Sequence, residues 1–246
     1  MSPLDARFAR SAHLNQVCVG ILAKKSLDSL TDSRDRLTVK ATDYVAELHR
    51  SQLLLLNDQH YGAAAAMMRL VMEGALSALY ILHLKDEAHA IQLEDGRTFL
   101  PSAGKMFARC SRLPIIGANI ETIGRSQGPF HKFTHGDMPQ INRRHSPSDW
   151  TGTFDEREIA TFSIIADFVL LGAMDTYSHA IADLVLQKAI RGVRDENGAE
   201  AKAFGMPIPE DDTLSPPPIR AGSGGPTRAP RPTVLKPASE QVEPES

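Results

Sequence analysis

Residues 61–81 limit how this chain can fold more than any other stretch, because they are apolar on almost every side of a helix. Only Arg69 and Glu73 carry a charge there. A helix without a polar face is normally buried among other helices. Four successive alanines at 63–66 also allow close helix approach. The stretch predicts a helix over residues 61–85 at the centre of a helical bundle.

The other long segments also show helical periodicity. Runs of β-branched residues with a period of two are absent, so nothing predicts a strand. The pattern predicts further helices over residues 4–25, 33–56, 102–113 and 154–193. Thr153 and Glu156 have the spacing of a capping box at the start of the last of these. The sequence therefore predicts an all-α, antiparallel bundle of about five or six helices.

The helix over residues 33–56 is expected to bury one stripe. That stripe comprises Leu37, Ala41, Tyr44, Leu48 and Leu55. Their spacing of three, four and seven residues places them on one side of a helix. This side is predicted to face the bundle.

The last 40 residues, 207–246, differ from the rest in composition. They hold 10 of the chain's 16 prolines and no aromatic residue. Such a segment cannot bury enough apolar surface to offset the entropy of ordering it. We expect a helical bundle domain over residues 1–206 and a disordered tail rich in proline and glycine over 207–246.

Charge and cysteine content narrow the range of partners. Lys and Arg number 27 against 30 Asp and Glu, so the net charge of -3 excludes a broad basic field for non-specific nucleic-acid binding. Cys18 and Cys110 cannot form a disulfide framework, which suits a reducing compartment. The most apolar stretch, 160–174, is shorter than the ~18–20 residues of a membrane helix and contains Asp167. We expect a cytoplasmic protein with no membrane partner, and a core helix over 160–174.

Arg69 and Glu73 are the first candidate binding residues. They stand four apart and share one face of their helix. Because an unpaired charge in a bundle core is costly, each needs a partner. They can satisfy each other, or line a polar cavity with a second helix, or lie on a helix that is less buried than its composition indicates.

A second group of candidates forms a local basic segment. Its members are Arg125, His131, Lys132, His135, Arg143, Arg144 and His145, opposed only by Asp137. Such a group can receive a phosphate or a carboxylate, or it can be an ordinary exposed loop. His131 and His135 stand four apart, but a metal site needs a third or fourth ligand. We expect no metal and no cofactor.

Two further features have simple interpretations. Asp175 and His179 stand four apart on the last predicted helix, and we expect a local hydrogen bond between them. Cys110 lies beside Arg109 and Arg112, which are expected to lower the pKa of its thiol. No Cys–His–Asx arrangement surrounds it, so we do not expect a catalytic thiol.

Two segments together resemble those of a known group of helical proteins. One is AAMMRLVMEGALSALY, which holds Arg69 and Glu73, and the other is HKFTHGD, residues 131–137, followed by a long apolar helix. In this pattern the chain resembles uncharacterised bacterial helical proteins and the HEPN superfamily over about residues 35–190. The resemblance implies a helical bundle that forms a homodimer.

Active members of that superfamily cleave RNA without metal, using an Arg and a His four to six residues apart. The resemblance assigns these roles to Arg125 and His131, which have five residues between them, with His135 as an alternative. A histidine can take the proton of a ribose 2′-hydroxyl, and an arginine can stabilise charge on the phosphate. Ser126 and Gly128-Pro129 depart from the superfamily's usual motif.

These observations lead to two main hypotheses and a weaker third. The first is a non-catalytic helical module that binds RNA, a nucleotide or a protein, in which Arg69, Glu73 and His135 form a buried network. The second is a metal-independent endoribonuclease of the toxin or defence type. A metal enzyme built on the two histidines and Glu73 is the weakest. Because the motif departs from the superfamily's, we expect the non-catalytic module.

Overall fold

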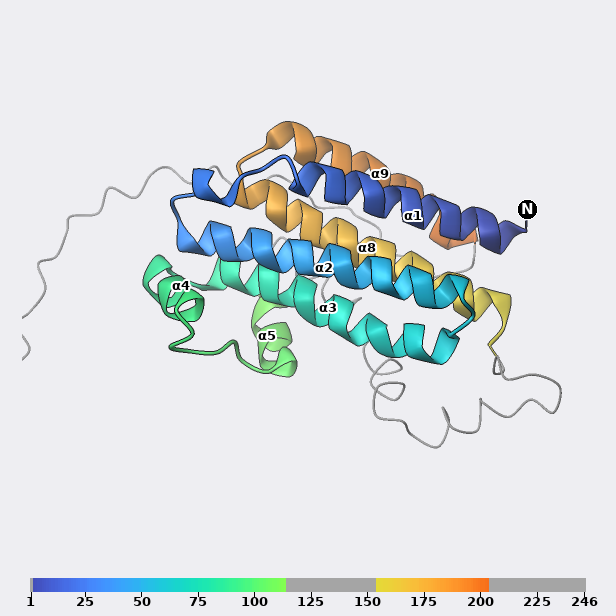
Figure 1. Cartoon of the computed structure of the whole chain (residues 1–246), viewed down its shortest axis with the longest axis horizontal. Helices are drawn as coiled ribbons and strands as arrows, with labels where there is room; N and C mark the ends of the chain where they lie inside the picture. Colours follow the sequence, from blue (N-terminus) through green and yellow to red (C-terminus); the bar gives the residue numbers. More distant parts are fainter. Residues whose placement is uncertain (1, 114–153, 204–246) are drawn as a thin grey trace, which may run out of the picture. The chain divides into compact units, whose positions relative to one another are not determined.

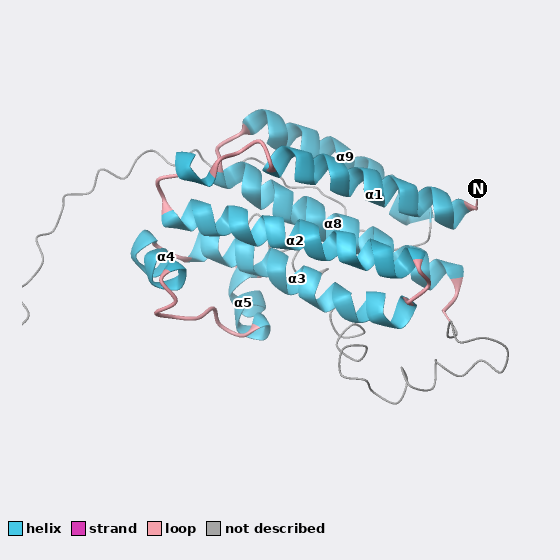
Figure 2. Ribbon diagram, viewed as in Figure 1, coloured by secondary structure: helices cyan, strands magenta, loops and turns pink. Residues whose placement is uncertain are grey.

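A computed structural model describes residues 2–113 and 154–203 of the chain, and these residues form helices and turns without a strand (Figures 1 and 2). The helices are α1 (Pro3–Leu22), α2 (Ser33–Asn57), α3 (Tyr61–Leu84), α4 (Glu87–Glu94), α5 (Ala103–Cys110), α8 (Glu156–Ala180) and α9 (Leu184–Ala203), with a 3-10 turn over Leu27–Ser29. The predicted all-α class is confirmed for these residues, with seven α-helices where five or six were expected. The tail predicted over 207–246 lies outside the described residues.

The five long helices lie side by side and alternate in direction. α1, α3 and α8 run one way, and α2 and α9 run the other (Figure 1). α8 packs against α1, α2, α3 and α9, whereas α3 packs against α2, α5 and α8. The prediction that the helix over 61–85 is the most buried is wrong: α8 buries more of its residues, and α3 keeps one side partly exposed, with Leu70 at 41%.

Two of these helices are long and apolar enough to cross a membrane by length and composition alone. They are α3 and α8, and 56% and 72% of their most apolar windows are buried inside the bundle. Core helices of water-soluble proteins have the same composition. Within the described residues, these helices bury their apolar sides against other helices.

The side of α2 that faces the bundle is rotated from the predicted stripe. Leu48 of that stripe is buried as predicted and Leu55 packs against the core, but Tyr44, expected inside, is 49% exposed. The side chains buried instead include Thr38, Thr42, Val45, His49, Gln52 and Leu56. The pattern was misleading because four of these six side chains are polar. Thr38 and Thr42 bond carbonyls of α2 itself, whereas His49 and Gln52 bond groups of other helices.

The long helix predicted over 154–193 is divided by a tight turn. Ala182 has a left-handed backbone with φ of 54°. Asp183 follows it, and its Oδ1 accepts a hydrogen bond from the N–H of Leu186 at 2.9 Å. This side chain satisfies a free N–H group at the start of α9, as an N-cap does. The chain reverses here, and α9 packs back along α8.

The start of α8 lies two residues later than the predicted capping box. Asp155 is the N-cap, and it exchanges hydrogen bonds with Glu158 in a capping box. Thr153, assigned to this role from the sequence, lies outside the described residues. Both pairs have the same spacing, so the pattern alone did not distinguish them.

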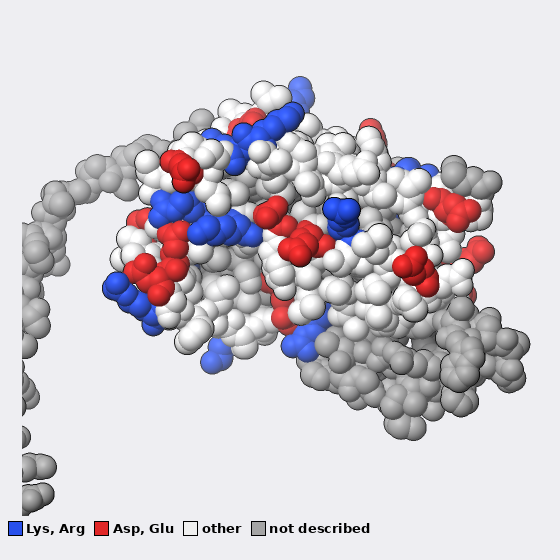
Figure 3. Space-filling view, in the orientation of Figure 1, with Lys and Arg blue, Asp and Glu red and all other residues white. Residues whose placement is uncertain are grey.

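Two short helices flank the bundle. α4, which the sequence pattern did not indicate, lies against the start of α2. Glu94 binds Arg36 at 2.7 Å and Lys40 at 2.9 Å, and Glu87 accepts the N–H of Ser33 at 2.7 Å. Figure 3 shows cationic and acidic side chains together over this region. α5 covers α3 through Met106 and Cys110, which form a second apolar cluster.

Candidate functional site

Six of the eight predicted site residues lie outside the described residues. They are Arg125, His131, Lys132, His135, Arg143 and Arg144. Their roles stay predictions. The other two, Arg69 and Glu73, are described.

Arg69 and Glu73 pair along the outer side of α3. Arg69 Nε lies 2.7 Å from Glu73 Oε1, and the two side chains are 34% and 30% exposed. Pairing is therefore confirmed, but the expected burial is wrong. The third alternative considered above, a helix less buried than its composition indicates, also holds. Such a partly wet pair contributes little to stability.

A different set of polar residues is fully buried, and it begins on α1. Arg7, Ser11 and Asn15 recur every four residues and form the first half of the buried side of α1. Arg7 is 0% exposed. Because a buried guanidinium is costly without partners, the surrounding helices must supply them.

Asp167, in the middle of α8, is the residue on which this set converges. Its Oδ2 accepts hydrogen bonds from Arg7 Nη2 and, at 2.9 Å, from Ser11 Oγ. Its Oδ1 lies 2.8 Å from His49 Nε2 of α2. We call Arg7, Ser11, Asn15, His49 and Asp167 the buried polar network.

The hydrogen bonds fix the orientation of the imidazole in this network. The Asn15 amide nitrogen donates to the carbonyl of Ala46 at 2.8 Å and lies 3.2 Å from His49 Nδ1. Nδ1 is then the acceptor, and Nε2 carries the proton that it donates to Asp167. Every member of the chain Asn15–His49–Asp167 has a defined role as donor or acceptor.

The network also reaches α9. Arg7 Nη1 binds Glu200 Oε2 at 2.5 Å and lies 3.4 Å from Asn197 Oδ1. Glu200 pairs in turn with Arg10. The network thus joins α1, α2, α8 and α9. Its central groups are sealed from solvent, so they hold the helices in register and have no access to a ligand.

The sequence contained only a weak sign of this network. Asp167 stood out as the charge in an apolar stretch. Arg7 and His49 carried no such sign, since each lies in a segment of mixed polarity. The spacing of Arg7, Ser11 and Asn15 indicates a shared face, but nothing in the sequence marks this polar face as the buried one.

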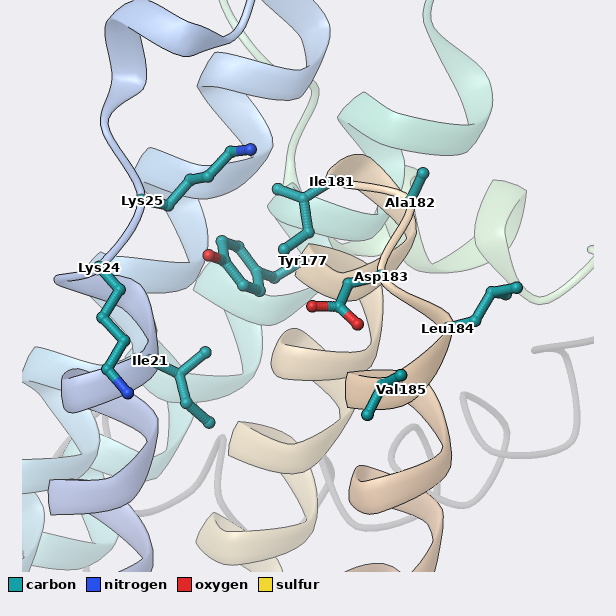
Figure 4. A pocket seen from close by; sticks show the side chains of 9 residues that line it. All are labelled: Ile21, Lys24, Lys25, Tyr177, Ile181, Ala182, Asp183, Leu184 and Val185. Atoms are coloured by element: carbon teal, nitrogen blue, oxygen red, sulfur yellow. The ribbon is translucent and has the colours of Figure 1, made fainter.

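A hollow of about 550 Å³ lies between the end of α1 and the turn that joins α8 to α9 (Figure 4). Its lining residues are Ile21, Lys24, Lys25, Tyr177, Ile181, Ala182, Asp183, Leu184 and Val185. The volume falls in the range of small-molecule sites, about 300–1,000 Å³. Polar groups on its α1 side face an apolar floor.

Tyr177 borders this hollow with the edge of an otherwise buried side chain. The residue is only 1% exposed, and its hydroxyl points toward the end of α1 in Figure 4. No described residue forms a hydrogen bond with it. Burial, together with the negative charge of Asp183, raises the pKa of Tyr177. The phenol therefore stays a hydrogen-bond donor near neutral pH.

The charge around the hollow is mainly positive. Lys24 and Lys25 lie on its α1 side, and neither forms an ion pair with a described residue. Asp183 opposes them, but one of its oxygens is occupied by the N–H of Leu186. Lys188 and Arg191 follow on α9, and cationic side chains gather over this end of the bundle in Figure 3.

Two smaller expectations are corrected. His179 Nε2 and Asp175 Oδ2 are 3.9 Å apart, too far for a hydrogen bond, and the Gln187 amide lies 3.4 Å from His179 Nδ1. The pKa of the Cys110 thiol is raised to about 11 by burial, and its arginine neighbours do not lower it. Burial and the charge of Asp167 raise the pKa of Cys18 to about 12.

The described residues contain no group of three or more His, Cys, Asp or Glu placed to hold a metal ion. Comparisons with family models, with curated proteins and with solved structures found no significant match to this chain. The resemblance to the HEPN superfamily therefore stays a prediction.

Proposed function

We propose that this protein is a non-catalytic helical binding module and that its ligand is anionic. The observation that supports the proposal is the hollow beside Tyr177. The Tyr177 hydroxyl and two lysines line it, and none of the three has a hydrogen-bond or ion-pair partner among the described residues. Such groups are suited to a carboxylate or a phosphate. The buried polar network, by contrast, is committed to holding the helices.

A thermal-shift screen tests this function. The purified protein is heated with inorganic phosphate, nucleotides and small carboxylates, beside the double variant Lys24→Glu with Lys25→Glu. A ligand at about 100 times its Kd stabilises the folded state by about 2.7 kcal/mol, which raises Tm by about 5–10 °C. We expect such a rise for the wild type and not for the variant.

A matched variant keeps this screen specific. Lys105→Glu makes the same charge reversal on α5, where the lysine is exposed and outside the hollow. It should respond to ligands as the wild type does. If no ligand raises the Tm, or if all three proteins respond equally, the hollow is not the binding site.

A second candidate function is the metal-independent ribonuclease. The observation that favours it is the all-helical, antiparallel bundle of the described residues, which is the architecture that the resemblance implies. Arg125 would stabilise the phosphate, and His131 would act as the base.

RNA cleavage in excess EDTA separates the two functions. Under the second function, the wild type cleaves RNA and the double variant His131→Ala with His135→Ala does not. Light scattering on the same samples should then give the mass of a homodimer. If neither protein cleaves RNA, the ribonuclease function is wrong and the binding module is retained. If both cleave RNA equally, His131 and His135 are not the catalytic site.

A further inference from the structure

We propose that the ligand of the hollow is a small amphiphile, with a carboxylate or phosphate head on a short hydrocarbon chain. The inference rests on the proposed binding function and specifies its ligand class. Positive charge explains the affinity for an anion but not the apolar half of the site. The apolar half is formed by α1, by the turn after α8 and by α9. Because its side chains are aliphatic, we expect the rest of the ligand to be hydrocarbon.

The floor and rim of the hollow are aliphatic. Ile21 of α1 and Ile181 of the turn line it together with Val185 of α9 (Figure 4). Val185 is 81% exposed, and its neighbour Leu184 is 71% exposed. Covering such side chains with hydrocarbon releases roughly 25 cal/mol for each Å² of apolar surface removed from water. A purely polar anion would leave this surface wet.

The polar groups lie on one side of this surface. The Tyr177 hydroxyl points toward the α1 end, where Lys24 and Lys25 lie (Figure 4). A head group held there can accept a hydrogen bond from the phenol. The ammonium groups of Lys24 and Lys25 point away from the hydroxyl on opposite sides (Figure 4), so their charges attract the head group over a longer range. The hydrocarbon chain then lies along Ile181 and Val185. One polar side and one apolar side are the arrangement that an amphiphile needs.

Asp183 is the one carboxylate in the lining, and it opposes an anionic head group. Its structural role is to accept the N–H of Leu186. Asparagine can accept the same hydrogen bond without the charge. Asp183→Asn should therefore preserve the turn and tighten binding of the anion several-fold, which a merely structural hollow would not show.

Isothermal titration with octanoate tests the proposal on the full chain. Octanol serves as the ligand without charge, and acetate as the ligand without a chain. We expect saturable, one-to-one binding of octanoate and at least tenfold weaker binding of both comparison ligands. Tyr177→Phe should weaken octanoate about three- to tenfold through the lost hydrogen bond. Lys24→Glu with Lys25→Glu should abolish it, while Lys105→Glu should not change it.

Several results would overturn the proposal. Equal binding of octanol and octanoate would show an apolar surface without anion recognition. Binding to vesicles of anionic lipid without binding of free octanoate would show a membrane-facing surface. If nucleotides or phosphate bind through the lysines and octanoate does not, the binding module stands and this ligand class is wrong. If no anion depends on the lysines, both proposals fail.

Discussion

At the scale of single residues, two ion pairs of the described part differ in how far they are buried. Arg7 and Asp167 form an ion pair whose side chains are 0% and 2% exposed. Arg69 and Glu73 form a pair about one-third exposed. Removing one partner of a buried pair leaves an uncompensated charge in a medium of low dielectric, whereas water solvates the survivor of an exposed pair.

We therefore predict unequal costs for the two carboxylates. Asp167→Ala should lower the free energy of unfolding by about 3–5 kcal/mol, since Arg7 and His49 lose their shared acceptor. Glu73→Ala should lower it by less than about 1 kcal/mol. Urea denaturation followed by circular dichroism measures both. Equal losses would mean that the α3 pair is as buried as its sequence suggested.

At the scale of elements, the contact between α2 and α3 depends on a glycine. A Cβ built at Gly74 would meet Val45 Cγ2 at 2.8 Å, closer than such atoms come in real structures. The two helices can approach this closely only because the side chain is absent. Gly172 of α8 is different, because a Cβ there would meet nothing within 4 Å.

This difference predicts opposite effects of the same substitution. Gly74→Ala should destabilise the protein by about 1–3 kcal/mol through overpacking against Val45. Gly172→Ala should stabilise it by about 0.5–1 kcal/mol through helix propensity alone. Thermal denaturation of the two variants provides the comparison. A stabilising Gly74→Ala would contradict the close packing of α2 on α3.

The attachment of α4 to α2 should depend on pH. Hydrogen bonds from Arg36 and then Lys40 hold the pKa of Glu94 at about 2, below its ordinary value of 4.5. Because the folded pKa is the lower one, this carboxylate stabilises the fold above about pH 4.5. That contribution is lost as the pH falls toward 2.

Glu94→Gln should therefore cost about 1 kcal/mol at neutral pH, the upper end for a partly exposed pair. The difference between wild type and variant should shrink as the pH falls from 4.5 to 2. Urea denaturation at a series of pH values measures it. If the difference in unfolding free energy stays constant over this range, folding does not lower the pKa of Glu94.

At the scale of the whole molecule, the described core lies within residues 2–203. Its main apolar cluster joins α1, α2, α3, α8 and α9. The composition of 207–246 predicts that this tail adds nothing to such a core.

We accordingly predict that a chain of residues 1–206 keeps the fold. Its Tm should equal that of the full chain within about 2 °C, because the few aliphatic residues of the tail offer too little apolar surface to offset the entropy of ordering it. Calorimetry of the two chains tests this. A clearly lower Tm would show that residues 207–246 pack on the bundle and would move the domain boundary.

Helix positions followed largely from local sequence. α2 and α3 begin at Ser33 and Tyr61, where they were predicted, because apolar spacing is a property of neighbouring residues. The turn at Ala182 and Asp183 was missed. A single left-handed residue reverses the chain there without a glycine or proline to indicate it.

The amino-acid sequence alone determined that the described part of this chain is helical, since helical periodicity depends on residues only three or four apart. It did not determine which sides of the helices meet. Arg7 and Asp167 are 160 residues apart in the sequence, and His49 lies between them. The three form one network only when α1, α2 and α8 pack together. Tyr177 and Lys25 likewise line one hollow only because α1 packs against α8. Those pairings depend on contacts between distant segments, which local patterns do not encode.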